Sequence, residues 1–241
     1  MTFDTVFAIL VIGSFLASLA NAMFSIGGAL IVLALSTTVL PISAVVPIHS
    51  TLMIGSTVWR VPLFWEHINW SIVRAFTIGS AIGAAIGARI FIELPETIVG
   101  TAIGVLMLVA MWLPAVKWRP KSDAPWLVVG LGHTFFSTIF AYGAILHAFA
   151  LFISEKRKEV IGTMAGCLVA MSIFKISGYI WVGFDYMPYL HIVVASFLVS
   201  FLGSWVGKRI GEFVSEPAFR LTYRVLVTIT ALRLIYVAWF A

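Results

Sequence analysis

The sequence predicts an all-α, polytopic membrane protein, and three observations support this prediction. Of the 241 residues, 61% are hydrophobic and only 10% are charged, and the mean hydropathy is +1.08. The apolar residues form long unbroken runs, whereas a transmembrane β-barrel would show short segments of alternating polarity. A soluble domain of this size cannot bury so much apolar surface, so the expected solvent for most of the chain is lipid.

The sequence lacks the features of several other classes. The single cysteine, Cys167, lies in an apolar run and excludes both an intramolecular disulfide and a cysteine-based metal cage. No nucleotide-binding loop and no zinc-binding histidine pair is present, so we expect no cofactor and no metal. The net charge of +5 comes from cations beside the apolar runs, which indicate membrane orientation rather than nucleic-acid binding.

Ten apolar segments follow one another along the chain, and charged or proline-containing stretches separate most of them. Most are long enough to cross a bilayer, which takes about 20 residues. The shorter ones fall into two pairs, within residues 5–40 and 125–153. The segments are 5–22, 26–40, 43–65, 69–92, 97–116, 125–141, 143–153, 160–182, 188–207 and 218–240.

The first pair is interrupted by two adjacent glycines, Gly27 and Gly28, with Asn21 and Ser25 close by. Glycine costs about 1 kcal/mol against alanine inside a helix, so the pair predicts a break. A helix that resumes near Gly28 would present free N–H groups and a positive dipole end to an anion. The alternative is a close-packed contact between helices, which small residues also permit.

The distribution of charge decides between two topologies for the paired segments. If each pair crosses once as a kinked helix, cations fall on both faces of the membrane. If each pair is a hairpin, nearly all cations share one face, as the positive-inside rule requires. The hairpin arrangement predicts that both termini lie outside the cytoplasm. The cations on the cytoplasmic face are then Arg60, Arg74, Lys117, Arg119, Lys121, Lys156, Arg157, Lys158, Lys208, Arg209 and Arg220. On the opposite face of the membrane lie Asp4, Glu93, Glu96 and Asp185, with Arg89 and Arg233 as the only cations.

The hairpin arrangement also predicts two inverted-topology repeats, residues 1–120 and 121–241. Each half has one broken, re-entrant hairpin and three crossings, and an odd number of crossings turns the second half upside down. Three short matches support a duplication: Gly83-x-x-x-Gly87 with Gly203-x-x-x-Gly207, Gly28-Ala29 with Gly143-Ala144, and Trp59-Arg60 with Phe174-Lys175. We interpret the two spaced glycine pairs as helix-packing contacts.

Two cations lie inside apolar segments. Lys175 stands well within the segment 160–182, where a charge costs on the order of 3 kcal/mol, and Arg60 stands two residues before Pro62. Either side chain could reach the membrane interface by snorkelling. The acidic residues all lie at predicted ends or loops, so neither cation has an evident carboxylate partner. A buried cation without one favours an anionic substrate.

Small polar groups cluster near both breaks and could donate hydrogen bonds to an oxyanion. For any one serine or threonine, the alternative is a bond back to its own helix. His49, His133 and His147 are the intramembrane candidates for proton movement, although a lone histidine is more often a satisfied interior group. The clusters are Asn21, Ser25, His49, Ser50 and Thr51 in the first half, and His133, Thr134, Ser137, Thr138, Tyr142 and His147 in the second.

The stretch Ser25-Ile26-Gly27-Gly28-Ala29-Leu30-Ile31-Val32-Leu33, early in a duplicated plan, resembles the sulfite exporter TauE/SafE family. That family carries a motif G-x-G-G-G-x-x-x-x-P at this point. Here Ser25, Ala29 and Ala34 stand in place of its first glycine, third glycine and proline. The resemblance implies a bacterial inner-membrane permease for small sulfur-containing anions. It also implies that Ser25, Gly27 and Gly28 line the translocation site.

The sequence therefore predicts a secondary transporter that moves sulfite or an organosulfonate by alternating access, with a proton as the coupling ion if there is one. The expected partners are the anion and the lipid bilayer, without nucleic acid, and a homodimer is compatible with the sequence. One alternative is a non-transporting membrane anchor or assembly subunit. A second, an intramembrane enzyme, lacks a nucleophile–base pair. The candidate substrate-binding residues are Asn21, Ser25, Gly27, Gly28, His49, Ser50, Thr51, Arg60, Thr138, Tyr142, Gly143 and Lys175.

Overall fold

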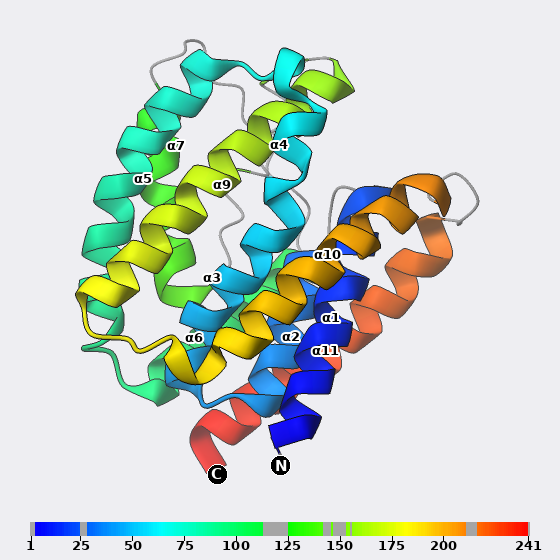
Figure 1. Cartoon of the computed structure of the whole chain (residues 1–241). Helices are drawn as coiled ribbons and strands as arrows, with labels where there is room; N and C mark the ends of the chain where they lie inside the picture. Colours follow the sequence, from blue (N-terminus) through cyan, green and yellow to red (C-terminus); the bar gives the residue numbers. More distant parts are fainter. Residues whose placement is uncertain are drawn as a thin grey trace.

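The computed structural model describes residues 3–24, 28–112, 125–141, 146, 153–154, 156–210 and 216–240. These residues form helices joined by turns, as predicted (Figure 1). Nine of the ten apolar segments coincide with described helices, and the tenth, 143–153, lies mostly outside the described residues. The helices are α1 (Phe3–Phe24), α2 (Gly28–Val39), α3 (Ile42–Val58), α4 (Arg60–Leu63), α5 (Trp70–Phe91), α6 (Glu96–Trp112), α7 (Pro125–Phe140), α9 (Arg157–Trp181), α10 (Leu190–Ile210) and α11 (Glu216–Phe240), with 3-10 turns at Trp65–His67 and Met187–Tyr189.

Five helices of the described part are long and apolar enough to cross a membrane. They lie at Asp4–Met23, Ile42–Pro62, Trp70–Phe91, Lys158–Trp181 and Met187–Gly207. The protein is therefore a multi-pass membrane protein. α1, expected as a short hairpin arm, is long enough for a full crossing because its break comes late, after Phe24. Its partner α2 has only 12 residues, about 18 Å at 1.5 Å per residue.

The chain runs along α1 and returns along α2 to the end from which it started. Figure 1 shows the N- and C-termini at the same end of the molecule, together with the turns that join α2 to α3, α5 to α6 and α9 to α10. α1 and α2 pack against each other. The first pair is thus a hairpin, as the charge distribution predicted.

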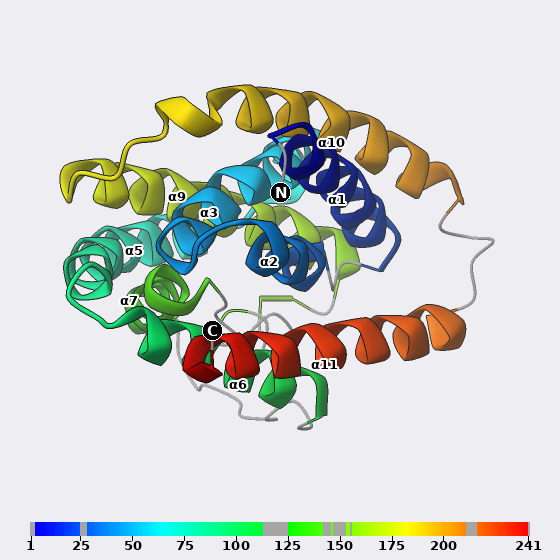
Figure 2. The same ribbon diagram turned by 90° about the horizontal axis from the view of Figure 1, so that it is seen from below.

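The helices pack around α3 and α9, which contact each other. α1 lies along α10 on one side, α5 lies along α7 on the other, and α6 pairs with α11 (Figure 2). The larger apolar core includes Leu10, Leu33, Ile48, Ile103 and Met107, all fully buried. The helices that flank the two breaks also contact this centre, α1 and α2 through α3 and α7 through α3 and α9.

Spaced glycines form the contacts of two helix pairs, which confirms their interpretation as packing residues. A Cβ added at Gly203 or Gly207 of α10 would lie 2.5 Å from the Phe15 carbonyl oxygen or 2.6 Å from the Leu19 carbonyl oxygen of α1. Real Cβ contacts do not come so close. Since both contacts advance by four residues, α1 and α10 run parallel.

The pair of α5 and α7 is built in the same way. A Cβ at Gly83 would lie well inside 3.0 Å of the Leu131 carbonyl oxygen, and one at Gly87 would lie 3.0 Å from that of Phe135. This pair is also parallel. In each pair, the glycines belong to a long membrane helix and the carbonyls belong to the first arm of a broken pair.

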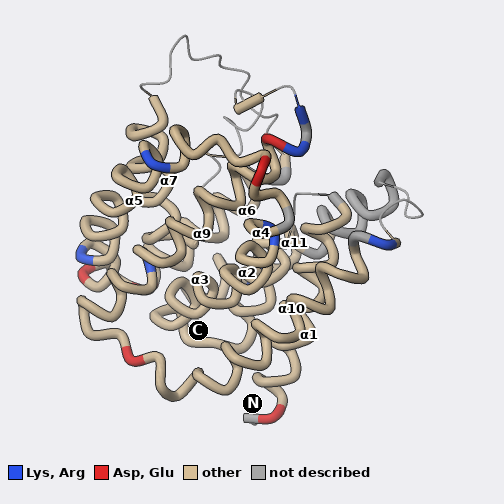
Figure 3. The backbone as a smooth tube through the Cα atoms, turned by 45° about the horizontal axis from the view of Figure 1, so that its top comes forward, with Lys and Arg blue, Asp and Glu red and all other residues tan. Residues whose placement is uncertain are grey.

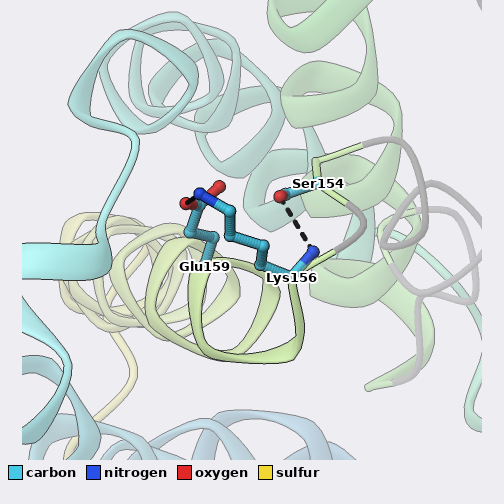
Figure 4. Close-up of polar contacts among 3 residues, drawn as sticks. All are labelled: Ser154, Lys156 and Glu159. Carbon is cyan, nitrogen blue, oxygen red and sulfur yellow. Dashed lines mark hydrogen bonds and ion pairs between the residues drawn. The ribbon is translucent and has the colours of Figure 1, made fainter.

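Charged side chains lie mainly at helix ends and turns, and most of the helical tube in Figure 3 carries none. At the start of α9, the Lys156 amide donates to Ser154 Oγ (3.0 Å) and the Lys156 ammonium pairs with Glu159 (3.1 Å; Figure 4). Glu159 also complements the positive end of the helix. Exposed pairs of this kind add little stability, so their main effect is to fix where α9 begins.

Candidate functional site

Lys175 is buried in the centre of the described bundle, with 1% of its surface exposed. Its ammonium donates to the backbone oxygen of Ser137 (2.7 Å) and to Ser137 Oγ (2.8 Å). The side chain therefore does not snorkel to the interface. α9 supplies the cation, and α7 supplies the two oxygens that hold it.

Lys175 binds α7 where that helix stops inside the protein. α7 has 16 residues, about 24 Å, which is shorter than the roughly 30 Å hydrocarbon core. The last carbonyls of a helix have no partner within it, and lipid offers none. Lys175 binds the carbonyl of Ser137, and the hydroxyl of Tyr179, one turn along α9, donates to the carbonyl of Thr138.

The residue after α7, Ala141, has a φ of 60° and is buried. This left-handed conformation commonly ends a helix, but usually at glycine, because a side chain there is strained. The described part of α7 therefore ends at a left-handed residue that is not glycine.

The positive charge of Lys175 is only partly compensated. The ion pairs of the described residues, Arg89–Glu93 and Lys156–Glu159, lie at the surface and do not involve Lys175. A helix C-terminus carries roughly half a negative elementary charge, against the full positive charge of an ammonium. When the Lys175 amine is protonated, this place in the bundle therefore has a net positive potential.

His49 of α3 lies close enough to Lys175 for the lysine charge to act on its ring. His49 is 3% exposed, and its Nε2 lies 2.9 Å from the carbonyl oxygen of Ala29. A carbonyl only accepts, so Nε2 carries the proton and Nδ1 is left as an acceptor. No described residue donates to His49 Nδ1, and a buried acceptor without a partner costs about 1–3 kcal/mol.

The first break is closed by Asn21. The Gly28 amide at the start of α2 donates to Asn21 Oδ1 (3.0 Å), and Asn21 Nδ2 lies 3.5 Å from Ser56 Oγ. A Cβ at Gly28 would overlap the Ala17 carbonyl and the Asn21 side chain. Close packing is therefore one role of Gly28, and its N–H group is already bonded in this conformation.

Three candidate hydroxyls donate back to their own helices, which is the alternative that the sequence left open. Ser50 donates to Val46, Thr51 to Ile48 and Thr138 to Thr134. A hydroxyl has one donor, so in this conformation these residues offer an anion no hydrogen.

The other candidates are spread more widely. Arg60 is partly buried and donates from Nε to the Ser56 carbonyl (3.2 Å), outside the Lys175 cluster. His133 accepts at Nδ1 from the Leu146 amide (3.1 Å), which ties α7 to the residues after the second break. Four candidates, Ser25, Gly27, Tyr142 and Gly143, and the proton candidate His147 lie outside the described residues.

A cavity of about 330 Å³ lies among the turns that join α2 to α3, α5 to α6 and α9 to α10. In Figure 1 these turns lie at the end of the molecule that carries the termini. Apolar side chains form most of the cavity wall, with Ser43 and Glu96 at exposed positions. Tyr179 contributes to the lining although it is fully buried. The lining residues are Ile42, Ser43, Phe91, Ile92, Leu94, Glu96, Val99, Tyr179, Val182, Gly183 and Phe184.

The list of substrate-binding candidates omitted Tyr179 and Ser137, which hold this site together, although Ser137 was among the polar groups noted near the second break. Tyr179 lies four residues after Lys175, on the same face of α9, and that spacing could have identified it. Ser137 is 38 residues from Lys175 in the chain, and no local pattern links the two.

The fold and the site define a multi-pass membrane protein with a buried, incompletely compensated cation between broken helices. The chain belongs to the sulfite exporter TauE/SafE family, whose model matches residues 10–234. The family is one of membrane transporters for sulfur-containing anions, not of enzymes. No match was found among curated proteins or among solved structures.

Proposed function

We propose that this protein is a secondary transporter that moves a small sulfur-containing anion, sulfite or an organosulfonate, across the bacterial inner membrane. The observation that carries the proposal is the buried ammonium of Lys175, held by the carbonyl end of α7 and not by a carboxylate. An arriving oxyanion would complete the charge balance. Ser137 and Lys175 would exchange part of their mutual hydrogen bonding for bonds to the anion.

We further propose that the two halves, 1–120 and 121–241, are inverted repeats that move against each other around this site. The helix pairing supports this, because α1 on α10 and α7 on α5 are equivalent contacts under such a repeat. The matched glycines Gly203 and Gly83 meet corresponding carbonyls in these two pairs. If the two halves exchanged their conformations, a site open to one side of the membrane would become a site open to the other side.

We infer the orientation from the charges. Arg74 and Lys156 lie at the end of the bundle opposite the termini, while Glu93, Glu96 and Asp185 lie at the same end as the termini, where Arg89 pairs with Glu93. By the positive-inside rule this distribution supports a periplasmic position for both termini.

His49 is our candidate for proton coupling. A proton on Nδ1 would turn a buried acceptor without a partner into a donor beside Lys175, and an anion would stabilise the resulting imidazolium. His133 is less suited, because its Nδ1 accepts from the Leu146 amide and must stay unprotonated to do so. Anion and proton would then leave together.

The test of the transport proposal is uptake of labelled sulfite into proteoliposomes, with unlabelled organosulfonates as competitors. Lys175→Ala should lower the saturable uptake about 10- to 100-fold, because this is the factor that corresponds to the loss of one hydrogen bond to a charged group. The matched control is Lys156→Ala, at the exposed start of the same helix, which should transport normally. Correctly inserted wild-type protein without saturable uptake of either anion class would disprove the proposal, and normal uptake by Lys175→Ala would remove its site.

The coupling proposal is tested with a pH-sensitive dye inside the same vesicles. Proton movement should accompany anion uptake, and uptake should rise as the pH on the loading side falls. His49→Gln should uncouple the two fluxes, whereas His67→Gln, in the turn Trp65–His67, should not. Unchanged proton movement in His49→Gln would exclude His49 as the carrier.

A further inference from the structure

The cavity at the end of the bundle that carries the termini leads toward Lys175 but does not reach it. Its inner wall includes Tyr179, and Lys175 lies one turn away from Tyr179, toward the start of α9. The two side chains bind successive carbonyls of α7, those of Thr138 and Ser137. The bond from Tyr179 to Thr138 therefore lies between the cavity and the ammonium.

Tyr179 is held from two sides. Its hydroxyl donates to α7, and its ring meets the edge of the Phe91 ring of α5 (centroids 5.6 Å apart, 72° between planes). A fully buried aromatic residue at the inner end of an open cavity closes that cavity. Rotation of one side chain, or a small shift of α9 against α7, would open it.

The lining is better suited to the passage of an anion than to its binding. Most of the wall is apolar, and Glu96 is the acidic group at its rim. Neither feature would bind an anion firmly. Low-dielectric walls do, however, concentrate the field of a charge beyond them, and the positive charge beyond Tyr179 is that of Lys175, one turn away on α9.

We propose that this cavity is the outer vestibule of the translocation pathway, and that Tyr179, latched to the Thr138 carbonyl, is the gate between the vestibule and Lys175. The occupant is the transported anion, so this inference rests on the proposed function. The structure then represents a state closed at Tyr179.

Cysteine accessibility tests the gate without depending on the substrate. The only natural cysteine, Cys167, is buried, so the wild-type chain is the unlabelled control. Ser43→Cys places a thiol in the vestibule, and Ser137→Cys places one behind the gate. The probe is a membrane-impermeant, sulfonate-bearing methanethiosulfonate added to right-side-out vesicles.

Ser43→Cys should react quickly whether or not Tyr179 is changed, which also reports that each variant is folded. Ser137→Cys should react slowly, and Tyr179→Phe should accelerate it about fivefold to tenfold, since one hydrogen bond of the closed state is lost. Tyr186→Phe is the matched control, because no described residue binds the Tyr186 hydroxyl, and it should change neither rate.

The outcomes separate the gate from the transport function. Equal rates for Ser43→Cys and Ser137→Cys would overturn the gate, as would a Ser137→Cys rate that Tyr179→Phe leaves unchanged. The expected rates together with absent anion flux would keep the gate and reject the proposed substrate. Normal anion flux, together with labelling rates that Tyr179→Phe leaves unchanged, would keep the transport function and reject the gate.

Discussion

The two helix breaks satisfy their open backbone groups in opposite ways. At the first break, the N–H group that starts α2 is bound by the neutral amide of Asn21, from the helix just before it. At the second, the carbonyls that end α7 are bound by Lys175 and Tyr179, from a later helix. The first break is locally closed and uncharged, whereas the second depends on tertiary contacts and holds a cation.

This difference shows where the attraction for an anion resides. A glycine-rich helix start suggests an anion site by itself, but here its first amide is already bonded. The residual charge lies at the other break, where roughly half a negative charge from a helix end faces a full positive charge. We therefore expect the two breaks to respond differently to substitution.

The largest effect is expected at Gly28. A side chain at this position would overlap the Ala17 carbonyl, so Gly28→Leu should destabilise the protein by about 3 kcal/mol or more. Thermal unfolding of the detergent-solubilised protein measures this. Gly178→Ala is the control, because its Cβ would lie 3.2 Å from Ala88 Cβ and needs only a small adjustment. Equal stability of the two variants would contradict the close packing of the first break.

An intermediate effect is expected for Asn21→Asp, which adds a negative charge at the first break but keeps the oxygen that accepts from the Gly28 amide. In Asn21→Asp, the carboxylate still accepts from the Gly28 amide, so the fold should persist. Its negative charge should lower anion uptake on the order of tenfold.

Asn21→Ala makes the opposite change, because it removes the cap and adds no charge. It should cost about 1 kcal/mol of stability and affect uptake less than Asn21→Asp does. If the aspartate variant transports as well as wild type, the anion does not approach the first break.

The smallest effect is expected at Ala141, the strained residue of the second break. Ala141→Gly removes the side-chain penalty at a φ of 60° but adds chain entropy to the unfolded state. The net result should be a gain of about 0.5–1 kcal/mol in stability, measured by thermal unfolding, with uptake unchanged. Ala165→Gly, at a buried position inside α9, should be destabilising instead, and a loss at both positions would argue against the left-handed turn.

Local patterns in the sequence predicted much of the fold. The apolar runs located the helices to within a few residues, and the adjacent glycines located the first break between Phe24 and Gly28. The spaced glycines predicted close packing, although not that Gly203 meets α1 and Gly83 meets α7. Sequence spacing identifies a residue that permits close approach, but not the helix that approaches.

The candidate site was predicted less completely. Lys175 and His49 were identified because a charge or an imidazole inside an apolar run is costly and therefore conspicuous. The serine and threonine candidates were less informative, because Ser50, Thr51 and Thr138 all donate within their own helices.

The sequence by itself determined that this chain lies in a membrane, where its helices run, and where the first of them breaks. These properties depend on local hydrophobicity and backbone freedom, which neighbouring residues specify. Only the tertiary structure decided what completes the second break and what the buried lysine binds. The Lys175 contact joins residues 38 positions apart, and the packing of α9 against α7 creates it.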